Sequence, residues 1–450
     1  MNSLRFIELA TVVMVILVVL MVVTTISVKA LRYLKASWYK RHYKKIEPAL
    51  GEFILTGEDQ PELLRLRSWQ RDLFLSRLIV ERMALLRGTG QESLMRLAAD
   101  LGLVDRYLKA LKSWRRWRRA RAAEYLGYFG GERAVDPLGK LLSDEDETIR
   151  AVAARALARI GSEEAVRLLV RTLDDPSELT RLRVAENLER IGHPVVGPLV
   201  KSLEDATDPG TAQLYGQIMA VRVLGNLRAA EAREVLCRAA RNGQSTNHRA
   251  QATLALGKIG DPEDVPALLE SARDESWPVR SQAGNALGMI GAVSTVPTLK
   301  KLAADKEWWV RLNAAKALVN MGPEGLLALL ELLQGDDRYA RARAAATLES
   351  RGITRRMVRQ LAAPDRRGER ARTIIRAVIE SGATKYLHGL AETLPDGEER
   401  QILFNMLEEH DELAKTDAAG SEQATTEHTA GESSGAEPKS AEPRGNRADS

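Results

Sequence analysis

The sequence contains little cysteine and few aromatic residues. Its single cysteine, Cys237, cannot form an internal disulfide or a cysteine-based zinc site. Aromatic residues make up 5% of the 450 residues, while 44% are hydrophobic and 28% are charged. This leucine- and alanine-rich composition is typical of helical proteins and not of β-sandwiches. The formal net charge is only +5, so charge alone does not predict a nucleic-acid-binding protein.

One segment, residues 9–28, contains no charged residue: "LATVVMVILVVLMVVTTISV". As a helix it would span about 30 Å, the thickness of the hydrocarbon core of a bilayer. Basic residues follow the segment, whereas a signal peptide carries its positive charge in front. The positive-inside rule therefore predicts one uncleaved transmembrane helix at the inner (plasma) membrane of a bacterium. Residues 1–8 would be extracytoplasmic, and the C-terminal domain would be cytoplasmic.

A basic juxtamembrane segment is predicted at residues 29–48. It interleaves aromatic residues with lysine and arginine, a combination that suits the headgroup level of an anionic membrane. A solvated linker is the alternative. The basic residues are Lys29, Arg32, Lys35, Lys40, Arg41, Lys44 and Lys45, and the aromatic residues are Tyr33, Trp38, Tyr39 and Tyr43.

A motif recurs along the chain with a step of 30 to 36 residues. Each copy ends at a glycine, except one in which Arg228 takes the place of the glycine. A fixed period in this range indicates a solenoid of stacked repeats. The glycines are Gly130, Gly161, Gly192, Gly260, Gly291, Gly322, Gly352 and Gly382.

Each copy is predicted to form two antiparallel helices. Leucine usually stands four residues before the glycine and alanine eight residues before it, on one face of a helix. The glycine suits the C′ position that ends this helix. A second apolar pattern follows, often opened by a proline, which the first turn of a helix tolerates. These prolines are Pro137, Pro198, Pro266 and Pro297.

The pattern "D…VRxxAxxALGxIG…VPxLxxLL" resembles HEAT repeats of the short bacterial type (PBS-lyase-like) that also occurs in phycobilin lyases. The resemblance covers residues 117–412 and implies an all-α fold, a right-handed α-solenoid of about nine helical hairpins. Residues 49–116 have the apolar spacing of helices but do not match the repeat motif, so they are predicted to be a helical cap. Residues 413–450 contain no aromatic residue and are predicted to be disordered. One step is longer than the others, which predicts a longer loop near residues 204–213.

An arginine recurs eleven residues before the glycine, and an aspartate often stands six residues before the arginine. The resemblance to HEAT repeats implies that these residues form a structural ladder between neighbouring repeats. A charged group that recurs in most copies is expected to be scaffolding, since a catalytic group is usually needed once. The expected ladder residues are Arg119, Arg150, Arg181, Arg249, Arg280, Arg311, Arg341, Asp144, Asp175, Asp274 and Asp305.

No catalytic, cofactor-binding or metal-binding residue is predicted. Deoxyhypusine hydroxylases with HEAT-like repeats hold iron through His-Glu pairs, but no histidine of this chain is followed by glutamate. The histidines are scattered, whereas a metal site needs clustered ligands. No feature marks a bilin site, and no glycine-rich phosphate loop or nucleophile elbow occurs. The histidines are His42, His193, His248, His388, His410 and His428.

Two basic clusters, residues 112–121 ("KSWRRWRRAR") and 355–376, remain open in function. A solvated charged face, a lipid contact and a nucleic-acid contact like that of HEAT-like DNA glycosylases are the alternatives. Trp114 and Trp117 are spaced three residues apart, like core residues of a helix.

In HEAT solenoids the second helix of each repeat lines the concave surface, so the resemblance implies that this surface is the expected binding site for a protein partner. Positions two, five and nine after the arginine should face outward, and several carry amides, which both donate and accept hydrogen bonds. The expected partner-binding residues are Arg183, Glu186, Arg190, Gln251, Lys258, Gln282, Asn285, Met289, Asn313, Lys316 and Asn320.

The sequence therefore predicts a membrane-anchored, non-catalytic scaffold or adaptor that binds a membrane-associated protein and needs no cofactor. An enzyme of the HEAT-like hydroxylase or bilin-lyase kind is the alternative, and bound metal or pigment would distinguish it. A nucleic-acid-binding protein is the second alternative, and steep salt dependence of binding would support it.

Overall fold

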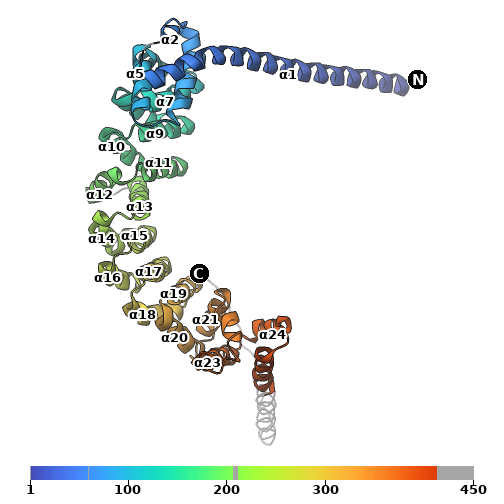
Figure 1. The fold of residues 1–450 in the computed structure, drawn as a ribbon, viewed down its shortest axis with the longest axis vertical. Helices are drawn as coiled ribbons and strands as arrows, with labels where there is room; N and C mark the ends of the chain where they lie inside the picture. Colours follow the sequence, from blue (N-terminus) through green and yellow to red (C-terminus); the bar gives the residue numbers. More distant parts are fainter. Residues whose placement is uncertain (1, 59, 206–210, 413–450) are drawn as a thin grey trace, which may run out of the picture. The chain divides into compact units, whose positions relative to one another are not determined.

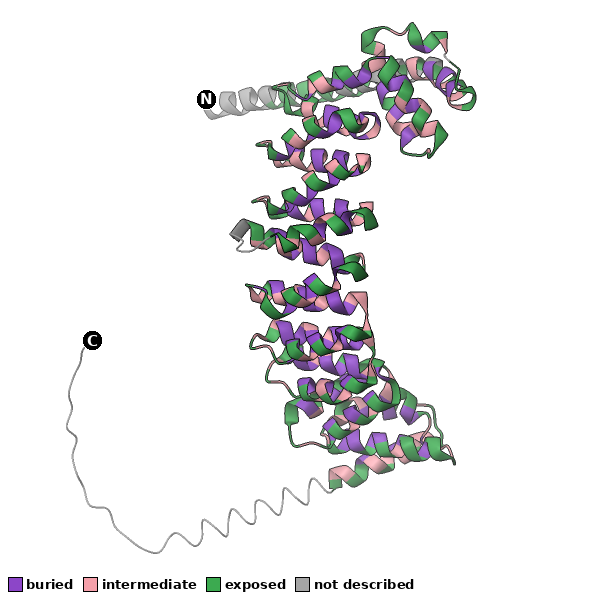
Figure 2. Ribbon diagram, turned by 90° about the vertical axis from the view of Figure 1, so that its left-hand side faces the viewer, coloured by how far each residue is buried: buried purple, intermediate pink, exposed green. Residues whose placement is uncertain are grey.

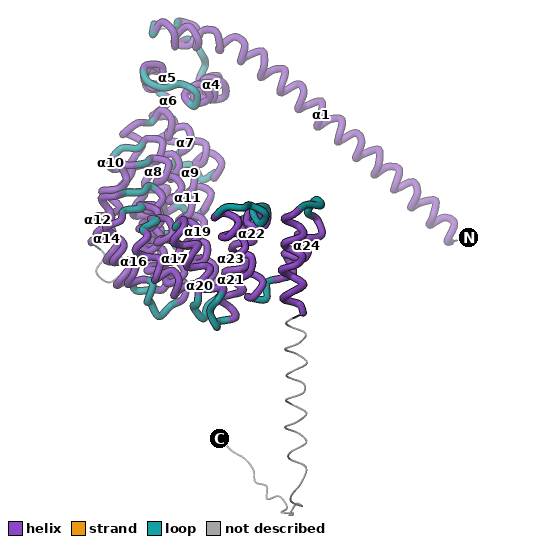
Figure 3. The backbone as a smooth tube through the Cα atoms, turned by 60° about the horizontal axis from the view of Figure 1, so that its bottom comes forward, coloured by secondary structure: helices purple, strands orange, loops and turns teal. Residues whose placement is uncertain are grey.

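The computed structural model describes residues 2–58, 60–205 and 211–412, and every regular element in them is a helix (Figure 3). The chain divides into two compact units, residues 1–236 and 237–450. The predicted disordered tail, residues 413–450, lies outside the described residues, as do residues 206–210 of the predicted long loop.

The first helix, α1 (Asn2–Thr56), continues through the segment that was expected to be juxtamembrane and into the cap. Ile46, Leu50 and Phe53 on its last turns are buried. The Tyr43 hydroxyl donates a hydrogen bond to Glu81 on α4 (Ser76–Met83) at 2.9 Å. Packing against the cap therefore begins before residue 49.

The N-terminal part of α1 exposes apolar side chains between residues 14 and 26. Among the residues whose side chains the structure describes, no helix is both long and apolar enough to cross a membrane. The span expected at residues 9–28 lies partly outside that set, because the side chains of residues 9–13, 15, 18 and 28 are not described. The exposed apolar residues are Met14, Ile16, Leu17, Val19, Leu20, Met21, Val22, Val23 and Ile26.

The cap consists of short helices that follow α1. They bury Phe74, Leu78, Ile79 and Leu94, so the cap has an apolar core of its own. The helices are α2 (Pro61–Leu64), α3 (Ser68–Gln70), the π-turn η1 (Arg71–Leu75), α4, α5 (Thr89–Asp100) and α6 (Leu103–Ala110).

The repeats of the first unit form two layers of helices (Figure 1). The second helices of the repeats lie side by side in one layer, which we call the second-helix layer: α7 (Arg116–Phe129), α9 (Glu147–Ile160), α11 (Glu178–Ile191) and α13 (Thr211–Asn226). The other layer contains α8 (Val135–Lys140), α10 (Glu163–Arg171) and α12 (Val196–Glu204).

The second unit is built in the same way, and the boundary between the units falls within α14 (Arg233–Asn242). Its second-helix layer contains α15 (Thr246–Ile259), α17 (Trp277–Ile290), α19 (Trp308–Asn320) and α21 (Arg338–Ser350). The facing layer contains α16 (Val265–Ser271), α18 (Val296–Ala303) and α20 (Gly322–Leu333). The unit continues with α22 (Ile353–Val358), α23 (Arg366–Glu380) and α24 (Thr384–Thr393), and residues 398–412 are helical as well.

The repeating positions explain why the helices begin, end and pack where they do. The residue four positions before the repeat glycine, or before Arg228 where it replaces that glycine, is buried in each repeat. It is leucine, as at Leu157 and Leu287, except for Val378 in the last repeat, and buried residues gather between helices (Figure 2). Most repeat glycines have a positive φ, as at Gly291 with 74°, and end a helix there. Gly130 differs: its φ is −76° and Gly131 takes the left-handed conformation instead. Arg228, which replaces a glycine, keeps the left-handed conformation with a φ of 52°.

Small residues let neighbouring helices of the second-helix layer approach closely. A Cβ atom added to Gly257 on α15 would lie 2.5 Å from the Cβ of Ala286 on α17. One added to Gly288 would lie 2.5 Å from the Cβ of Ala317 on α19. These distances are too short for two carbon atoms, so larger residues would separate the helices.

Candidate functional site: the ladder and the face of the second-helix layer

Arg280 shows the geometry of the ladder. Its Nε and Nη2 donate to the two carboxylate oxygens of Asp305 in the next repeat, at 2.7 and 3.0 Å. Its Nη1 donates to the backbone carbonyl oxygens of Asp274 and Glu275 in its own repeat, at 2.9 and 2.8 Å. Arg280 thus holds the turn of its own repeat with one nitrogen and the next repeat with the other two.

The aspartate of the ladder is also used more than once. Besides accepting from Arg280, Asp305 accepts a hydrogen bond at 2.9 Å from the backbone N–H of Glu307. Burial alone would raise the pKa of Asp305, but the hydrogen bonds from Arg280 and Glu307 outweigh it and hold this pKa below its usual value. The hydrogen bond to Asp305 in turn raises the pKa of Arg280. The pair is therefore ionised and mutually stabilised.

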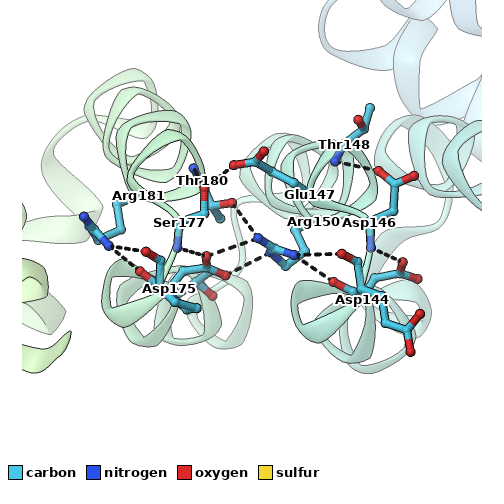
Figure 4. Close-up of polar contacts among 12 residues, drawn as sticks. Asp144, Asp146, Glu147, Thr148, Arg150, Asp175, Ser177, Thr180 and Arg181 are labelled. Carbon is cyan, nitrogen blue, oxygen red and sulfur yellow. Dashed lines mark hydrogen bonds and ion pairs between the residues drawn. The ribbon is translucent and has the colours of Figure 1, made fainter.

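The same fork-shaped pairing occurs elsewhere in each unit. Arg119 contacts Asp144 at 2.9 and 3.0 Å, and Arg249 contacts Asp274 at 2.8 and 3.1 Å. Arg150 pairs with Asp175, with 3.0 Å between Nε and Oδ2 (Figure 4). The four pairs join residues 25 positions apart, so each links one repeat to the next.

Three of the expected ladder arginines form no such pair in the described part of the chain. Arg181, Arg311 and Arg341 keep their hydrogen bonds to the backbone of the preceding turn. For Arg181, the position 25 residues on is 206, which the structure does not describe. Arg181 and Arg311 instead lie over tyrosine rings, 4.7 Å from the Tyr215 centroid and 5.3 Å from the Tyr339 centroid respectively.

The residues expected on the binding face are all at least partly accessible to solvent. Arg183, Glu186, Arg190, Met289, Lys316 and Asn320 are exposed, and Gln251, Lys258, Gln282, Asn285 and Asn313 are half-buried.

Several of these side chains already bond within the protein. Asn313 donates to the hydroxyl of Ser281 at 2.9 Å, Arg190 donates to Asn187 at 2.7 Å, and Arg183 pairs with Glu186 at 3.0 Å. In each unit, some polar side chains of this face are therefore already held by hydrogen bonds within the protein.

The basic cluster at residues 112–121 is more exposed than its spacing predicted. Trp114 is 83% exposed and Trp117 is 51% exposed, so the prediction that they resemble core residues is wrong. Trp114 precedes α7, which begins at Arg116, so helical spacing does not apply to it. Arg115 lies 4.8 Å from the Trp114 ring centroid, and Arg118 lies 5.4 Å from that of Trp117. In the second cluster, Arg355, Arg356, Arg359, Arg366, Arg367, Arg370 and Arg376 are exposed.

A group of exposed aromatic residues in the second unit was not predicted from the sequence. They lie in the first turns of three successive helices of the second-helix layer and are 41–57% exposed. Trp277 and Trp308 occupy the same position of successive repeats, fourteen residues before the glycine, which is the signal that could have revealed them. The group comprises Trp277, Trp308, Trp309 and Tyr339.

No group of His, Cys, Asp and Glu residues within the described ranges is arranged to hold a metal ion. His193 contacts Glu231 at 3.1 Å, and His388 contacts Asp411 at 3.6 Å. His248 is buried, neither ring nitrogen finds a hydrogen-bond partner among the residues that the structure describes, and burial lowers its pKa. A cavity of about 820 Å³ between α10 and α12 has a lining of mixed charge that includes Arg167 and Asp174.

A family model described as HEAT repeats matches residues 104–189, 198–283 and 268–349. Together these segments cover more than half of the chain. The chain belongs to the HEAT-repeat family. The all-α HEAT solenoid predicted from the sequence is thereby confirmed, whereas no curated protein matches the chain.

Several solved structures are similar to this HEAT-repeat chain. The Escherichia coli protein YibA is 22% identical, with 57% of this chain and 95% of YibA covered and a TM-score of 0.36. Human deoxyhypusine hydroxylase is 22% identical over 55% of this chain and 95% of the hydroxylase, with a TM-score of 0.24. The CpcE–CpcF phycocyanin lyase of Nostoc sp. PCC7120 is 20% identical over 55% and 94%, with a TM-score of 0.27. These TM-scores are too low to carry a functional argument.

Proposed function

We propose that this HEAT-repeat protein is a membrane-anchored, non-catalytic scaffold whose second-helix layer binds a protein partner. HEAT solenoids typically bind proteins along the extended surfaces that their stacked helices create. The observation that carries the proposal is the repetition of accessible polar side chains at the same positions of successive helices, such as Gln282 on α17 and Asn313 on α19.

The ladder supports a rigid binding face. Four arginine–aspartate pairs join neighbouring repeats, and the close glycine–alanine contacts fix the distance between helices. A pre-organised surface loses little conformational entropy when a partner binds. The second-helix layer thus offers polar groups at fixed spacing.

The membrane attachment belongs to the proposal and is supported by α1. This helix is 55 residues long, and the side chains described between residues 14 and 26 are apolar and exposed on all sides, apart from the polar threonines 24 and 25. Both threonine hydroxyls bond to the backbone carbonyl of Met21, as polar groups in an apolar environment require. The solenoid would then lie at the cytoplasmic face, close to a membrane-associated partner.

Crosslinking in native membranes tests the proposal with a variant that leaves the core intact. Gln282, Asn285, Lys316 and Asn320 are replaced together by alanine; Asn313 is kept because it holds Ser281. The partner that crosslinks to the native protein should be recovered at least tenfold less with the variant, because few residues carry most interface energy.

The matched control replaces four exposed residues by alanine: Arg167, Lys201 and Lys301 on helices of the facing layer, and Glu263 in the turn just before α16. This variant should recover the partner normally. Equal recovery with the two variants would show that the second-helix layer is not the binding face.

A further inference from the structure

The ladder is interrupted in the second unit by the residue that replaces one aspartate. The backbone carbonyl of Gly335 accepts from Nη1 of Arg341 at 2.9 Å, as the carbonyl of Asp305 accepts from Nη1 of Arg311 at 2.7 Å. Gly335 therefore occupies the aspartate position of its repeat. It has no side chain to offer, so the carboxylate that Arg311 would receive from the next repeat is missing.

The interruption differs from a repeat that lacks the whole ladder pair. Gly243 also stands at an aspartate position, with its carbonyl accepting from Arg249 at 3.2 Å. The repeat before Gly243, however, has no ladder arginine, because Gln217 occupies that position, eleven residues before Arg228. At Gly335 the carboxylate alone is lost, and the arginine is retained.

Arg311 is nevertheless held in the same orientation as the paired arginines. It is only 9% exposed, and its Nη1 donates to the carbonyl oxygens of Asp305 and Lys306 at 2.7 and 2.9 Å. In the described part of the chain, no acceptor bonds to its Nε or Nη2, the two nitrogens that grip aspartate in Arg280. The acidic residues of the following turn do not fill the gap. Asp336 stands 25 residues after Arg311, but in the described part of the chain its carboxylate makes no hydrogen bond or ion pair with Arg311, and its carbonyl accepts from Arg341. Asp337 accepts from the backbone N–H groups of Tyr339 and Ala340.

A second arginine beside Arg311 is also without a carboxylate. The guanidinium of Arg343 lies 4.9 Å from the ring centroid of Trp308, and its buried Nε has no hydrogen-bond partner in the described residues. Burial, followed by the charge of Arg311, lowers the pKa of Arg343. Two like charges therefore lie close together, and neither forms an ion pair within the described residues.

Exposed aromatic rings lie beside these two arginines: Tyr339 beside Arg311, and Trp308, which contacts Trp309, beside Arg343. Trp308, Trp309 and Tyr339 are 44%, 53% and 57% exposed. The two tryptophan rings meet edge to face with centroids 4.5 Å apart. Exposed aromatic rings beside arginine are the residue types that dominate the energy of protein interfaces.

We propose that Arg311, Arg343, Trp308, Trp309 and Tyr339, here called the Arg311 site, bind an acidic segment of a protein partner. A carboxylate of the partner takes the place of the missing ladder aspartate on Nε and Nη2 of Arg311. An apolar side chain next to that carboxylate packs against the exposed rings. This inference rests on the proposed scaffold function and adds the chemistry of the partner.

The occupant is a side-chain carboxylate and not a nucleic-acid backbone. Arg311 is more than nine-tenths buried, so a single slender side chain can reach it, whereas a strand of phosphates requires a row of exposed cations. The geometry of the other repeats is that of a carboxylate held by two parallel hydrogen bonds, as between Arg249 and Asp274. The Asp or Glu of a partner would form with Arg311 the ion pair that the ladder aspartate forms in the paired repeats.

The test selects twelve-residue peptides from a random displayed library on the full chain in lipid nanodiscs, with empty nanodiscs for subtraction. The selected peptides should carry Asp or Glu beside an aliphatic or aromatic residue. Changing that acidic residue to its amide should weaken binding at least tenfold. Arg311→Gln should weaken binding equally, and the two changes together should have no further effect.

A gain of the missing carboxylate provides the sharper variant. Gly335 does not have a left-handed φ, and a Cβ there would meet the carbonyl oxygens of Glu331 and Leu332 at 3.6 Å, an ordinary contact. Gly335→Asp should therefore pair with Arg311, raise the thermal midpoint and abolish peptide binding. Gly335→Asn, its uncharged match, should bind the peptides within twofold of the native chain.

Three results would overturn the inference. Selection could yield no acidic motif, the peptides could bind Gly335→Asp as tightly as the native chain, or an oligothymidine strand could compete with them. Crosslinking separates this inference from the proposed function. A partner lost with the second-helix-layer variant but kept with Gly335→Asp leaves the scaffold function standing and removes the Arg311 site. A partner kept with both variants removes both.

Discussion

Arg280 and Asp305 belong to successive repeats, and they meet as a two-point ion pair that is about nine-tenths buried at both side chains. The same arginine also binds the carbonyl oxygen of Asp274, the aspartate of its own repeat. Asp274 gives its carboxylate to Arg249 of the preceding repeat. Where the pairs occur, successive repeats are thus joined in one direction along the chain, and each paired arginine binds two turns.

The first prediction concerns this pair. Arg280→Ala should lower the free energy of unfolding by about 1–3 kcal/mol, because Asp305 loses two charge-assisted hydrogen bonds in a largely buried position. Hydrogen exchange should increase most in the turns around residues 274 and 305. The control is Arg183→Ala: its pair with Glu186 is more than half exposed, so the cost should be about 0–1 kcal/mol. Equal costs at the two arginines would contradict a structural role for the ladder.

Much of this fold could be predicted because the same residue types recur at the same positions of many repeats. The spacing of Leu287 and Gly291 predicts a helix with one buried face and a left-handed end, and both features are present. The partner of each arginine could not be predicted in the same way. Asp274 stands only six residues before Arg280, yet its carboxylate pairs with Arg249, which is 25 residues earlier in the sequence. The stacking of one repeat on the next brings these two distant residues together.

The candidate sites were less predictable, since they depend on departures from the repeat. The spacing of Trp114 and Trp117 suggested core residues only if both lie on one helix, but Trp114 precedes Arg116, the first residue of α7. The unpaired state of Arg311 follows from a glycine at position 335, which matters only when the three-dimensional pairing is known. Repetition in a sequence therefore predicts the scaffold better than the binding site.

The second prediction uses Arg228, whose φ of 52° is one that glycine adopts without strain. Arg228 is exposed, so its side chain adds little packing. Arg228→Gly should raise the stability of the first unit by about 0.5–1 kcal/mol, because the left-handed strain is removed. Arg228→Val should destabilise it, since a β-branched residue tolerates this conformation poorly. Thermal unfolding of the two variants checks the order; a less stable glycine variant would mean that Arg228 makes a contact that outweighs its strain.

The third prediction is a dependence of stability on pH through His248. Burial lowers the pKa of this histidine below its ordinary value of about 6.5, so the unfolded chain binds the proton more readily. The stability contributed by neutral His248 is complete above about pH 6.5 and declines as the pH falls toward the lower, folded pKa. His248→Leu should remove this component, at most about 1.4 kcal/mol per pH unit. Urea unfolding at pH 7.5 and 5.5 measures it.

The control for His248 is His193→Gln, because the His193 side chain is 73% exposed. This variant should keep the full pH dependence of the native chain. If His248→Leu kept it as well, the acid sensitivity would have to come from other groups, such as ladder aspartates, whose lowered pKa values affect stability only at a lower pH.

The last prediction concerns the orientation of the chain in the membrane. The basic residues between 29 and 45 favour the cytoplasmic side of the membrane. Alkaline phosphatase is active only outside the cytoplasm, so it should be inactive when fused after Glu412. A fluorescent protein that folds in the cytoplasm should be bright when fused at the same place. Replacing those seven basic residues by glutamine and adding four lysines before residue 9 should exchange the two signals, because the charge asymmetry would then be reversed. Carbonate extraction completes the test. Release of the native chain from membranes by carbonate would refute the anchor. An active phosphatase on the unaltered sequence would refute its orientation.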